Sequence, residues 1–349
     1  MLSTVRKKIL VISPSGNFYG SEQVLLDYLR STRLNADVMV PAGSLFLEIL
    51  AGSGMRHSFI PYDSSKLPMF YGKVFFWLLQ GKYDVVYLNE AGHNKYINVL
   101  AGIFRNKRFF IHIRIKEDTE PSRWKKSRSN VQLITISQFI QDLLPIKSTL
   151  LYDSFSFSDK RIRLKGNVTN QPLRVGIIGR ISYSKGVTEL IELLNILKVH
   201  GRNSYEIYLF GDEGSDIKGT GLLDEIKGYS FIKVKGFVRD QHEMYSNIDV
   251  VLHLSKTEPL GRIFFEAIEE GKPLIGFNAA GIGEIGKMTG LSELLVEVAD
   301  NSCLEIFKRL EMVRQHYSSY VERVVDRKEI VARILNIAHY SNSLDKMMT

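Results

Sequence analysis

Two cations lie close together in the segment GRISYSKG at 179–186, between an apolar run and an amphipathic stretch. Arg180 and Lys185 are these cations, and the flanking patterns predict a strand before them and a helix after them. A turn from strand to helix presents free backbone N–H groups and the positive end of the helix to an anion, and both side chains add full charge. The segment therefore suits a diphosphate group, although cations in such a loop often contact only solvent.

Two carboxylates eight residues apart form a second candidate. Glu258 and Glu266 flank Gly261, which lets the backbone approach a ligand closely, and Arg262 begins a predicted helix with free N–H groups. Glu266 lies among the apolar residues of that helix, so its carboxylate could accept both hydroxyl groups of a ribose. The alternative is a loop or capping role for Glu258 and a solvated helix position for Glu266.

Short β-branched or aromatic runs alternate with amphipathic stretches along most of the chain, which indicates parallel sheets built from β-α units. The predicted strands are 8–13, 37–40, 85–88, 109–113, 133–136, 150–152, 175–178, 205–210, 231–234, 249–254 and 274–277. A polar linker at 161–171 separates the two series. This pattern predicts an α/β fold with two Rossmann-like doubly wound domains facing across a cleft, where ligands of open sheets bind.

The 349 residues are enough for two domains, each with its own core. We expect the first domain at 1–165, the second at 166–330, and a C-terminal helix at 331–349 that could cross back to the first domain. Neither domain carries GxGxxG or a GxxxxGK[ST] loop, which removes the main support for a dinucleotide enzyme or an ordinary NTPase.

The composition excludes further classes of protein. With 44% hydrophobic and 24% charged residues, the chain is typical of a folded globular protein. A single cysteine, Cys303, excludes a disulfide framework, and we expect a cytoplasmic protein. No stretch approaches the roughly 18 apolar residues of a membrane span. The net charge of +8 favours an anionic partner, such as nucleic acid, an anionic membrane surface or a phosphate-bearing substrate.

The order and spacing of several motifs resemble one known family. GRISYSKG is followed by LFGDEG at 209–214, GFV at 236–238 and EPLGRIFFEAIEEGKPLIGF at 258–277. Together these runs resemble the C-terminal half of the family 4 retaining glycosyltransferases of GT-B fold. In the first half the likeness is weaker and rests on the GSE that starts at Gly20, on His112, and on ITISQF at 134–139.

The resemblance implies a role for each matched position. Arg180 and Lys185 would bind the diphosphate of a nucleotide-sugar donor, Glu266 its ribose, and Glu258 the hydroxyls of the transferred sugar. The helix start at Gly261, Arg262 and Ile263 would offer backbone N–H groups. The base would lie beside Gly236, Phe237 and Val238. From the first domain, Gly20 and Ser21 would approach the distal phosphate and His112 the transferred sugar.

The reaction implied is sugar transfer without a metal or other cofactor, because fixed cations and amide dipoles can stabilise the charge left on a nucleoside diphosphate. The catalytic set would be His112, Glu258, Arg180 and Lys185. We expect a UDP-sugar donor and the transfer of a hexosyl or N-acetylhexosaminyl group. Two positions depart from the family: Tyr19 replaces a glycine, and Asp153 stands where the family often has asparagine.

Basic residues gather in the first domain, near an aromatic-rich predicted helix at 69–79 and around Trp124. They are Arg105, Lys107, Arg108, Arg114, Lys116, Arg123, Lys125, Lys126 and Arg128. Cations beside exposed aromatic rings favour an anionic membrane surface. We therefore expect peripheral association with the inner face of the plasma membrane and a saccharide or polyprenyl-diphosphate-linked acceptor. The product would be lipopolysaccharide, O-antigen or another surface polysaccharide.

The sequence leaves other functions open. A sugar-nucleotide epimerase or phosphorylase could use the same fold, because a fold does not dictate a reaction. A non-catalytic nucleotide-sugar-binding protein is a further alternative, which the intact set of charged residues disfavours. We do not expect a nucleic-acid partner, since no recognition motif is visible. His253 is interpreted as a core residue, and Cys303 as chemically inert.

Overall fold

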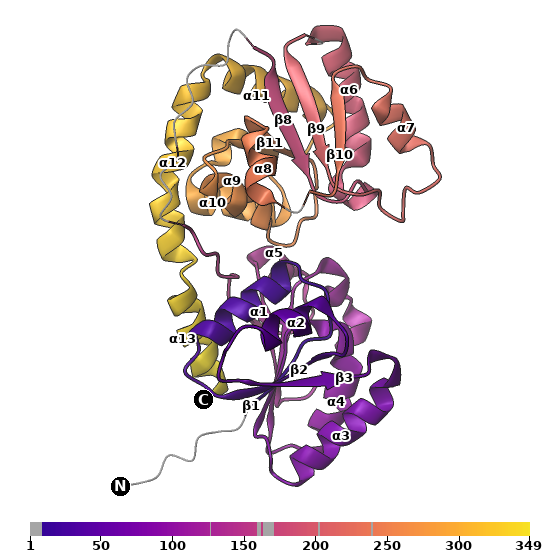
Figure 1. Cartoon of the computed structure of the whole chain (residues 1–349), viewed down its shortest axis with the longest axis vertical. Coiled ribbons are helices and arrows are strands. Elements are labelled where there is room, and N and C mark those ends of the chain that lie inside the picture. The colour runs from indigo at the N-terminus through magenta and orange to yellow at the C-terminus, as the bar shows by residue number, and fades with distance from the viewer. Residues whose placement is uncertain (1–8, 126, 159–161, 163–170, 202, 239) are drawn as a thin grey trace. The chain divides into compact units, whose positions relative to one another are not determined.

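The computed structural model of the chain describes residues 9–125, 127–158, 162, 171–201, 203–238 and 240–349. The chain divides into two compact units, one formed by 1–156 with 335–349 and the other by 157–334. Each unit is a parallel β-sheet with helices on its faces (Figure 1). The sequence placed the boundaries at 165/166 and 330/331, and most of the expected linker at 161–171 lies outside the described residues.

The first unit contains a seven-stranded sheet in the order β3-β2-β1-β4-β5-β6-β7. Its strands are β1 (Ile9–Ile12), β2 (Ala36–Pro41), β3 (Ser58–Tyr62), β4 (Val85–Leu88), β5 (Arg108–Ile113), β6 (Val131–Thr135) and β7 (Ser148–Leu150). Its helices are α1 (Gly20–Ser31), α2 (Leu45–Ala51), α3 (Leu67–Leu79), α4 (Asn94–Ile103), α5 (Gln138–Leu143) and α13 (Ile337–Met348). The central strands are buried along their whole length, as parallel strands covered by helices must be.

The second unit contains a six-stranded sheet in the order β10-β9-β8-β11-β12-β13. Its strands are β8 (Leu173–Ile178), β9 (Tyr205–Phe210), β10 (Ile232–Gly236), β11 (Val250–His253), β12 (Leu274–Phe277) and β13 (Leu295–Val296). Its helices are α6 (Val187–His200), α7 (Leu222–Lys227), α8 (Gln241–Ser246), α9 (Arg262–Glu269), α10 (Ala280–Thr289), α11 (Ser302–Gln315) and α12 (Tyr317–Ile334).

These two sheets confirm the predicted fold class of two Rossmann-like units. The predicted strands at 85–88, 205–210 and 274–277 coincide with β4, β9 and β12. Two edge strands, β3 and β13, were not predicted. An edge strand is covered on fewer sides, and β3 is half exposed and contains Pro61, so it lacks the continuous apolar run of a central strand. β13 has only two residues.

The C-terminal helix α13 completes the first unit. Asp345 accepts hydrogen bonds from the Tyr28 hydroxyl at 2.8 Å and from the Thr32 hydroxyl at 2.6 Å, both on or next to α1. Tyr340 and Leu344 of α13 belong to the same buried core as β1 and α1. The last residues of the chain are therefore structural members of the first sheet's core.

Gly186 makes the connection from β8 to α6 possible. Gly186 is the N-cap of α6, and its φ is +84°, a backbone angle that residues with a Cβ rarely adopt. A Cβ at this position would lie 2.2 Å from the Leu254 carbonyl oxygen, so the loop can pass this close to β11 only as glycine.

Gly186→Ala should lower the free energy of unfolding by at least about 3 kcal/mol, because left-handed strain and overpacking add. Gly219→Ala is the matched control: Gly219 has φ +78° but open space around it, so only strain of about 1–2 kcal/mol is expected there. Urea unfolding measures both. Equal losses in the two variants would show that the contact with Leu254 is unimportant.

Candidate active site

The candidate residues of the second unit meet where the strand order reverses. β8 and β11 are neighbours in the sheet, but the chain leaves β8 toward β9 on one side and β11 toward β12 on the other. In open parallel sheets this reversal opens a crevice at the carboxyl ends of the strands. Arg180 and Lys185 follow β8, and Glu258 follows β11.

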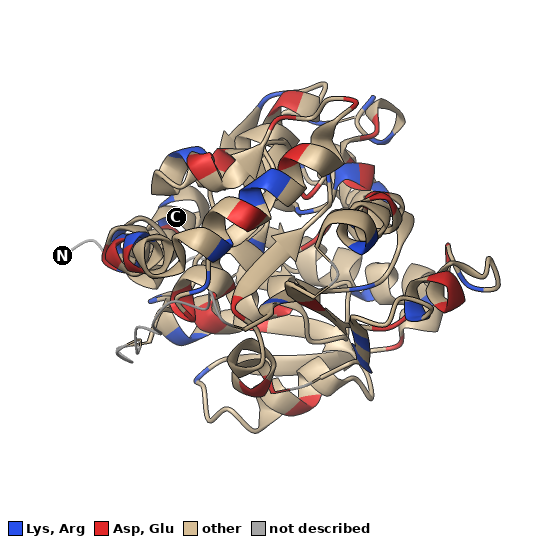
Figure 2. Ribbon diagram, turned by 90° about the horizontal axis from the view of Figure 1, so that it is seen from above, with Lys and Arg blue, Asp and Glu red and all other residues tan. Residues whose placement is uncertain are grey.

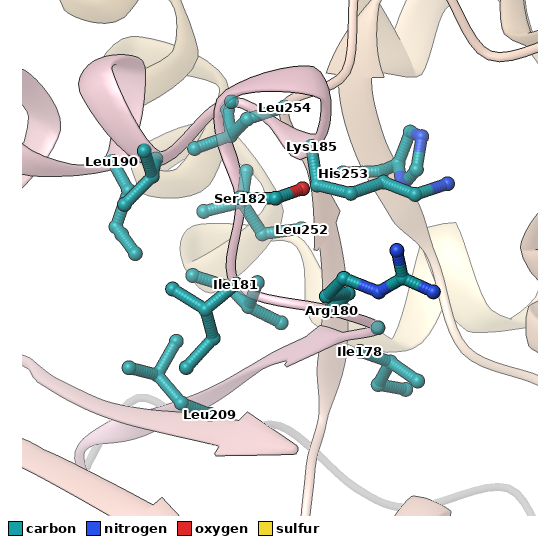
Figure 3. A pocket seen from close by; sticks show the side chains of 14 residues that line it. Ile178, Arg180, Ile181, Ser182, Lys185, Leu190, Leu209, Leu252, His253 and Leu254 are labelled. Carbon is teal, nitrogen blue, oxygen red and sulfur yellow. The ribbon is translucent and has the colours of Figure 1, made fainter. Parts of the chain in front are cut away.

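Lys185 and Glu258 form an ion pair across this reversal. The Lys185 Nζ lies 2.5 Å from the Glu258 Oε2, and the Glu258 side chain is 17% exposed. A small cavity of about 20 Å³ adjoins the pair and is lined by Arg180, Lys185 and His253, among others. The side chains of these three residues extend in the same direction (Figure 3). The structure thus brings together two cations and one carboxylate that the sequence singled out.

His253 is a core residue, as the sequence indicated, and it also joins this group. It is the last residue of β11 and is buried, and its Nε2 lies 3.5 Å from the Glu258 Oε2. Burial alone would raise the pKa of Glu258, but His253 and the Lys185 ammonium outweigh burial and hold that pKa at about 2. Glu258 is therefore ionised at neutral pH and can accept hydrogen bonds from hydroxyl groups.

Glu266 lies on α9, where its carboxylate accepts a hydrogen bond of 3.2 Å from the Tyr245 hydroxyl of α8. Burial raises the pKa of Glu266, against the opposing effects of Arg262 and Tyr245. Among the described contacts none joins Glu266 to Lys185. The α9 start has the geometry that the sequence suggested, since Gly261 has φ +86° and packs against Ile282, and Ile263 follows in the first turn.

The expected base contact lies at the end of β10. Gly236 has φ +66°, and its carbonyl oxygen accepts a hydrogen bond from the Gly211 N–H at 2.8 Å. The Phe237 side chain is exposed and Val238 is half-buried. An exposed aromatic ring beside an open glycine turn is free to stack on a planar group.

In the first unit, Gly20 and Ser21 open α1, and Ser21 joins two carboxylates. The Ser21 Oγ lies 2.6 Å from the Glu90 Oε1 and 3.1 Å from the Glu22 Oε2. One hydroxyl proton cannot serve both carboxylates. Burial raises the pKa of Glu90, an effect partly offset by the hydrogen bond from Ser21. The sequence did not single out Glu90, which follows β4 as Glu258 follows β11.

His112 lies on β5 and is completely buried. Its Nδ1 is 2.8 Å from the Tyr87 hydroxyl and 3.4 Å from the Arg114 Nη2. Its Nε2 has no hydrogen-bond partner among the described residues. Burial, followed by the nearby Arg114 charge, lowers the pKa of His112 well below its ordinary value. The side chain is therefore a neutral imidazole with one buried nitrogen that has no partner among the described residues.

The basic cluster of the first domain differs from its expected character. Trp124 is only 2% exposed, and its Nε1 donates to the Asp118 carbonyl oxygen at 2.7 Å, so its inclusion in an exposed membrane surface was wrong. Arg114 is buried against Asp153, Lys107 is buried and paired with Asp84, and Arg123 pairs with Asp118. Acidic residues are interspersed with basic ones in Figure 2. Lys126 lies outside the described residues.

The described residues contain neither a membrane-spanning helix nor a cluster of metal ligands. None of their helices is long and apolar enough to cross a membrane. No group of three or more His, Cys, Asp or Glu side chains among them could hold a metal ion.

The family described as glycosyl transferases group 1 matches residues 158–333, which is half of the chain, and the chain belongs to this family. The predicted resemblance to the family 4 glycosyltransferases is thereby confirmed. The matched region contains Arg180, Lys185, Glu258 and Glu266, whereas His112, Gly20 and Ser21 lie outside it.

Two curated relatives match part of the chain. One is the GtfA subunit of the UDP-N-acetylglucosamine–peptide N-acetylglucosaminyltransferase of Streptococcus parasanguinis, 28% identical over 148 residues. The other is an uncharacterised 42.6 kDa protein of the cps region of Klebsiella pneumoniae, 26% identical over 188 residues. The matches cover 37% and 51% of this chain but only 29% and 48% of the relatives, so the chain spans less than half the length of either.

Solved structures share the fold over nearly the whole chain. HepE of Anabaena in complex with UDP and glucose has a TM-score of 0.75 at 18% identity, with 98% of this chain and 99% of that chain covered. The apo lipopolysaccharide outer core galactosyltransferase WaaB has a TM-score of 0.66 at 15% identity, with 96% and 99% covered. These likenesses confirm the GT-B fold.

Glu258→Gln should lower the free energy of unfolding by about 2 kcal/mol at neutral pH, because it removes a charge-assisted hydrogen bond. The pKa of Glu258 is about 2 in the folded chain and ordinarily 4.5, so the contribution is fully present above pH 4.5 and is lost as the pH falls toward 2. The gap between parent and variant should therefore narrow below pH 4.5 in urea unfolding.

Glu305→Gln is the matched control, because the Lys308 and Glu305 side chains form an exposed ion pair at 2.7 Å. We expect a change below about 0.5 kcal/mol there. A gap for Glu258→Gln that stays constant from pH 7 to pH 3 would contradict the low pKa.

Proposed function

We propose that the chain is a retaining, metal-independent hexosyl- or N-acetylhexosaminyltransferase. It moves the sugar of a UDP-sugar to a saccharide or polyprenyl-diphosphate-linked acceptor in the synthesis of lipopolysaccharide, O-antigen or another surface polysaccharide. The observation that carries this proposal is the group of Arg180, Lys185 and Glu258 at the strand reversal of a glycosyl transferases group 1 unit. The UDP and glucose bound to HepE, and the cps region and lipopolysaccharide core of other relatives, support it.

The chemical step breaks the bond between the sugar and the diphosphate and leaves negative charge on UDP. Arg180 and Lys185 bind that charge, together with the backbone N–H groups at the starts of α6 and α9. Fixed cations and amide dipoles of this kind supply the stabilisation that a divalent cation would otherwise give, so transfer survives EDTA. Glu258 accepts hydrogen bonds from hydroxyls of the transferred sugar.

The remaining contacts hold the nucleotide and the far side of the sugar. Glu266 accepts the ribose hydroxyls, and Gly236, Phe237 and Val238 border the base. Gly261, Arg262 and Ile263 offer backbone N–H groups. In the first unit, the N–H groups of Gly20 and Ser21 approach the distal phosphate, since the Ser21 hydroxyl is engaged by Glu90. His112 contacts the transferred sugar through its Nε2, the buried nitrogen to which no described residue is hydrogen-bonded.

Lys185→Ala should weaken UDP binding by roughly 1.5–3 kcal/mol, the size of one hydrogen bond to a charged group. The control is Lys308→Ala, which removes a lysine from an exposed ion pair in the same unit and should leave the affinity unchanged. Calorimetry measures the dissociation constants of both variants. Equal affinities in the parent and in Lys185→Ala would contradict the proposal that Lys185 binds the diphosphate.

The same preparations should be given a UDP-sugar with lipid-linked or saccharide acceptors. Transfer by the parent supports the proposed enzyme. UDP binding without transfer to any acceptor would favour a nucleotide-sugar-binding protein, and turnover of the donor without an acceptor would favour an epimerase or phosphorylase.

We also propose that the first unit associates peripherally with the inner face of the plasma membrane. The proposed surface keeps the expected aromatic-rich helix at 69–79 but pairs it with α4 in place of Trp124. This α3/α4 surface consists of Met69, Lys73, Phe76 and Leu79 of α3 with Lys95, Val99 and Ile103 of α4. The two helices are adjacent, since the Phe75 and Phe104 rings are 5.2 Å apart, and neither helix contains an acidic residue. Exposed apolar residues flanked by lysines suit an anionic lipid surface.

A cavity beside this surface carries two further cations. Arg105 and Arg128 line it together with Ser127, Ser129 and Asn130, and its volume is about 280 Å³. Such a cavity can take the phosphate of a lipid headgroup.

Phe76→Ser combined with Ile103→Ser should reduce binding to anionic liposomes at least tenfold, because each exposed apolar side chain gains about 1.5–3 kcal/mol when buried in lipid. Val199→Ser is the control, because Val199 on α6 is an apolar residue even more exposed than Phe76 and Ile103. Binding should also weaken with rising salt. Co-sedimentation with neutral liposomes that equals the anionic result at every salt concentration would contradict the electrostatic part.

A further inference from the structure

We propose that Arg114, neutralised by Asp153, is a positioning residue that fixes His112 as the tautomer with its proton on Nε2. His112 then meets the sugar only as a neutral hydrogen-bond donor and takes no part in proton transfer. The contact between His112 and the sugar rests on the proposed function; the tautomer itself does not.

Arg114 is the centre of a buried polar network at the carboxyl ends of β4 and β5. Its Nε donates to the Asn89 carbonyl oxygen at 2.9 Å, and its Nη2 donates to the Asn89 Oδ1 at 3.2 Å. Its Nη1 bonds both carboxylate oxygens of Asp153, which follows β7. Every direction of the guanidinium is thus engaged, so the group is held in one orientation.

The proton count at His112 follows from this orientation. A guanidinium has no acceptor, so the Arg114 Nη2, 3.4 Å from the His112 Nδ1, can only donate to it. The Tyr87 hydroxyl lies 2.8 Å from the same Nδ1 and 3.3 Å from the Asn89 Oδ1, so its single proton can serve only one of them, and Arg114 is the donor that cannot reverse. A neutral imidazole that accepts at Nδ1 carries its proton on Nε2. That Nε2 is the buried nitrogen with no partner among the described residues, so its N–H is free for a ligand.

The charges around His112 keep the ring neutral. The titratable groups that contact it are Tyr87 of β4 and Arg114 of β5. Asp153 after β7 and Tyr340 of α13 lie in the next layer, where they interact with Tyr87 and Arg114. Arg114 opposes a second positive charge, and Asp153 offsets Arg114 rather than His112. Complete burial acts in the same direction. Near neutral pH, His112 therefore keeps its single proton and does not gain a second one.

This network explains why position 153 carries an aspartate. Where the resemblance to family 4 leads one to expect asparagine, this chain has a carboxylate, and the carboxylate is the counter-charge of a buried arginine. A buried guanidinium left without a counter-charge is strongly destabilising. Arg114 and Asp153 thus depend on each other.

The direct test is a nitrogen NMR spectrum of the full chain labelled with ¹⁵N-histidine, with His112 assigned by its loss in His112→Asn. We expect the signal of a bare nitrogen at Nδ1 and of a protonated one at Nε2, unchanged between pH 5.5 and 8. A proton on Nδ1, or titration within this range, would overturn the proposal. No substrate is needed, so this result is independent of whether the chain transfers sugar.

The second test is the double variant Arg114→Met with Asp153→Asn, which removes both buried charges together. Because Tyr87 can donate or accept, the variant should show both tautomers of His112. Its kcat should fall about tenfold, which corresponds to an activation free energy raised by about 1.4 kcal/mol. The KM for the UDP-sugar should change less than twofold.

The matched control is Arg30→Met with Asp27→Asn, a more exposed pair on α1. It should change neither the tautomer of His112 nor kcat. An unchanged tautomer and kcat in the double variant would show that Arg114 is merely structural. If the double variant does not fold, the spectrum of the parent still decides. An unchanged kcat in His112→Ala would refute the sugar contact and leave the tautomer standing.

Discussion

A charge taken out of water needs a counter-charge, and this requirement organises both units. In the second unit, Lys185 and Glu258 meet across the reversal between β8 and β11. In the first unit, the Arg114 guanidinium meets the Asp153 carboxylate. The parallel sheets place these groups because their loops diverge only at the reversal, where a ligand can take the space that helices occupy elsewhere.

The polarity of each hydrogen-bonding group is set before any ligand arrives. Lys185 and Arg180 can only donate, and Glu258, with its low pKa, can only accept. His112 presents one buried nitrogen whose character depends on the donors at its other nitrogen. A site with fixed donors and acceptors does not have to reorganise when charge develops on a leaving diphosphate, and this is the main physical source of catalysis in such a site.

Local signals in the sequence predicted the second unit well. GRISYSKG and the two spaced glutamates are adjacent to strong strand patterns, so their place at the sheet edge follows from chain order alone. The first unit was less predictable. Trp124 and Arg114 carry no local sign of burial, because burial depends on segments that pack against them from elsewhere in the chain. Glu90 and His253 could have been found, since both end or follow strands that flank a reversal.

The most direct measurement of the central claim is a crystal structure of the chain grown with UDP. We expect diphosphate oxygens within hydrogen-bond distance of the Lys185 Nζ and the Arg180 guanidinium. The ribose hydroxyls should donate hydrogen bonds to the Glu266 carboxylate. UDP bound elsewhere, with Lys185 still paired only to Glu258, would contradict it.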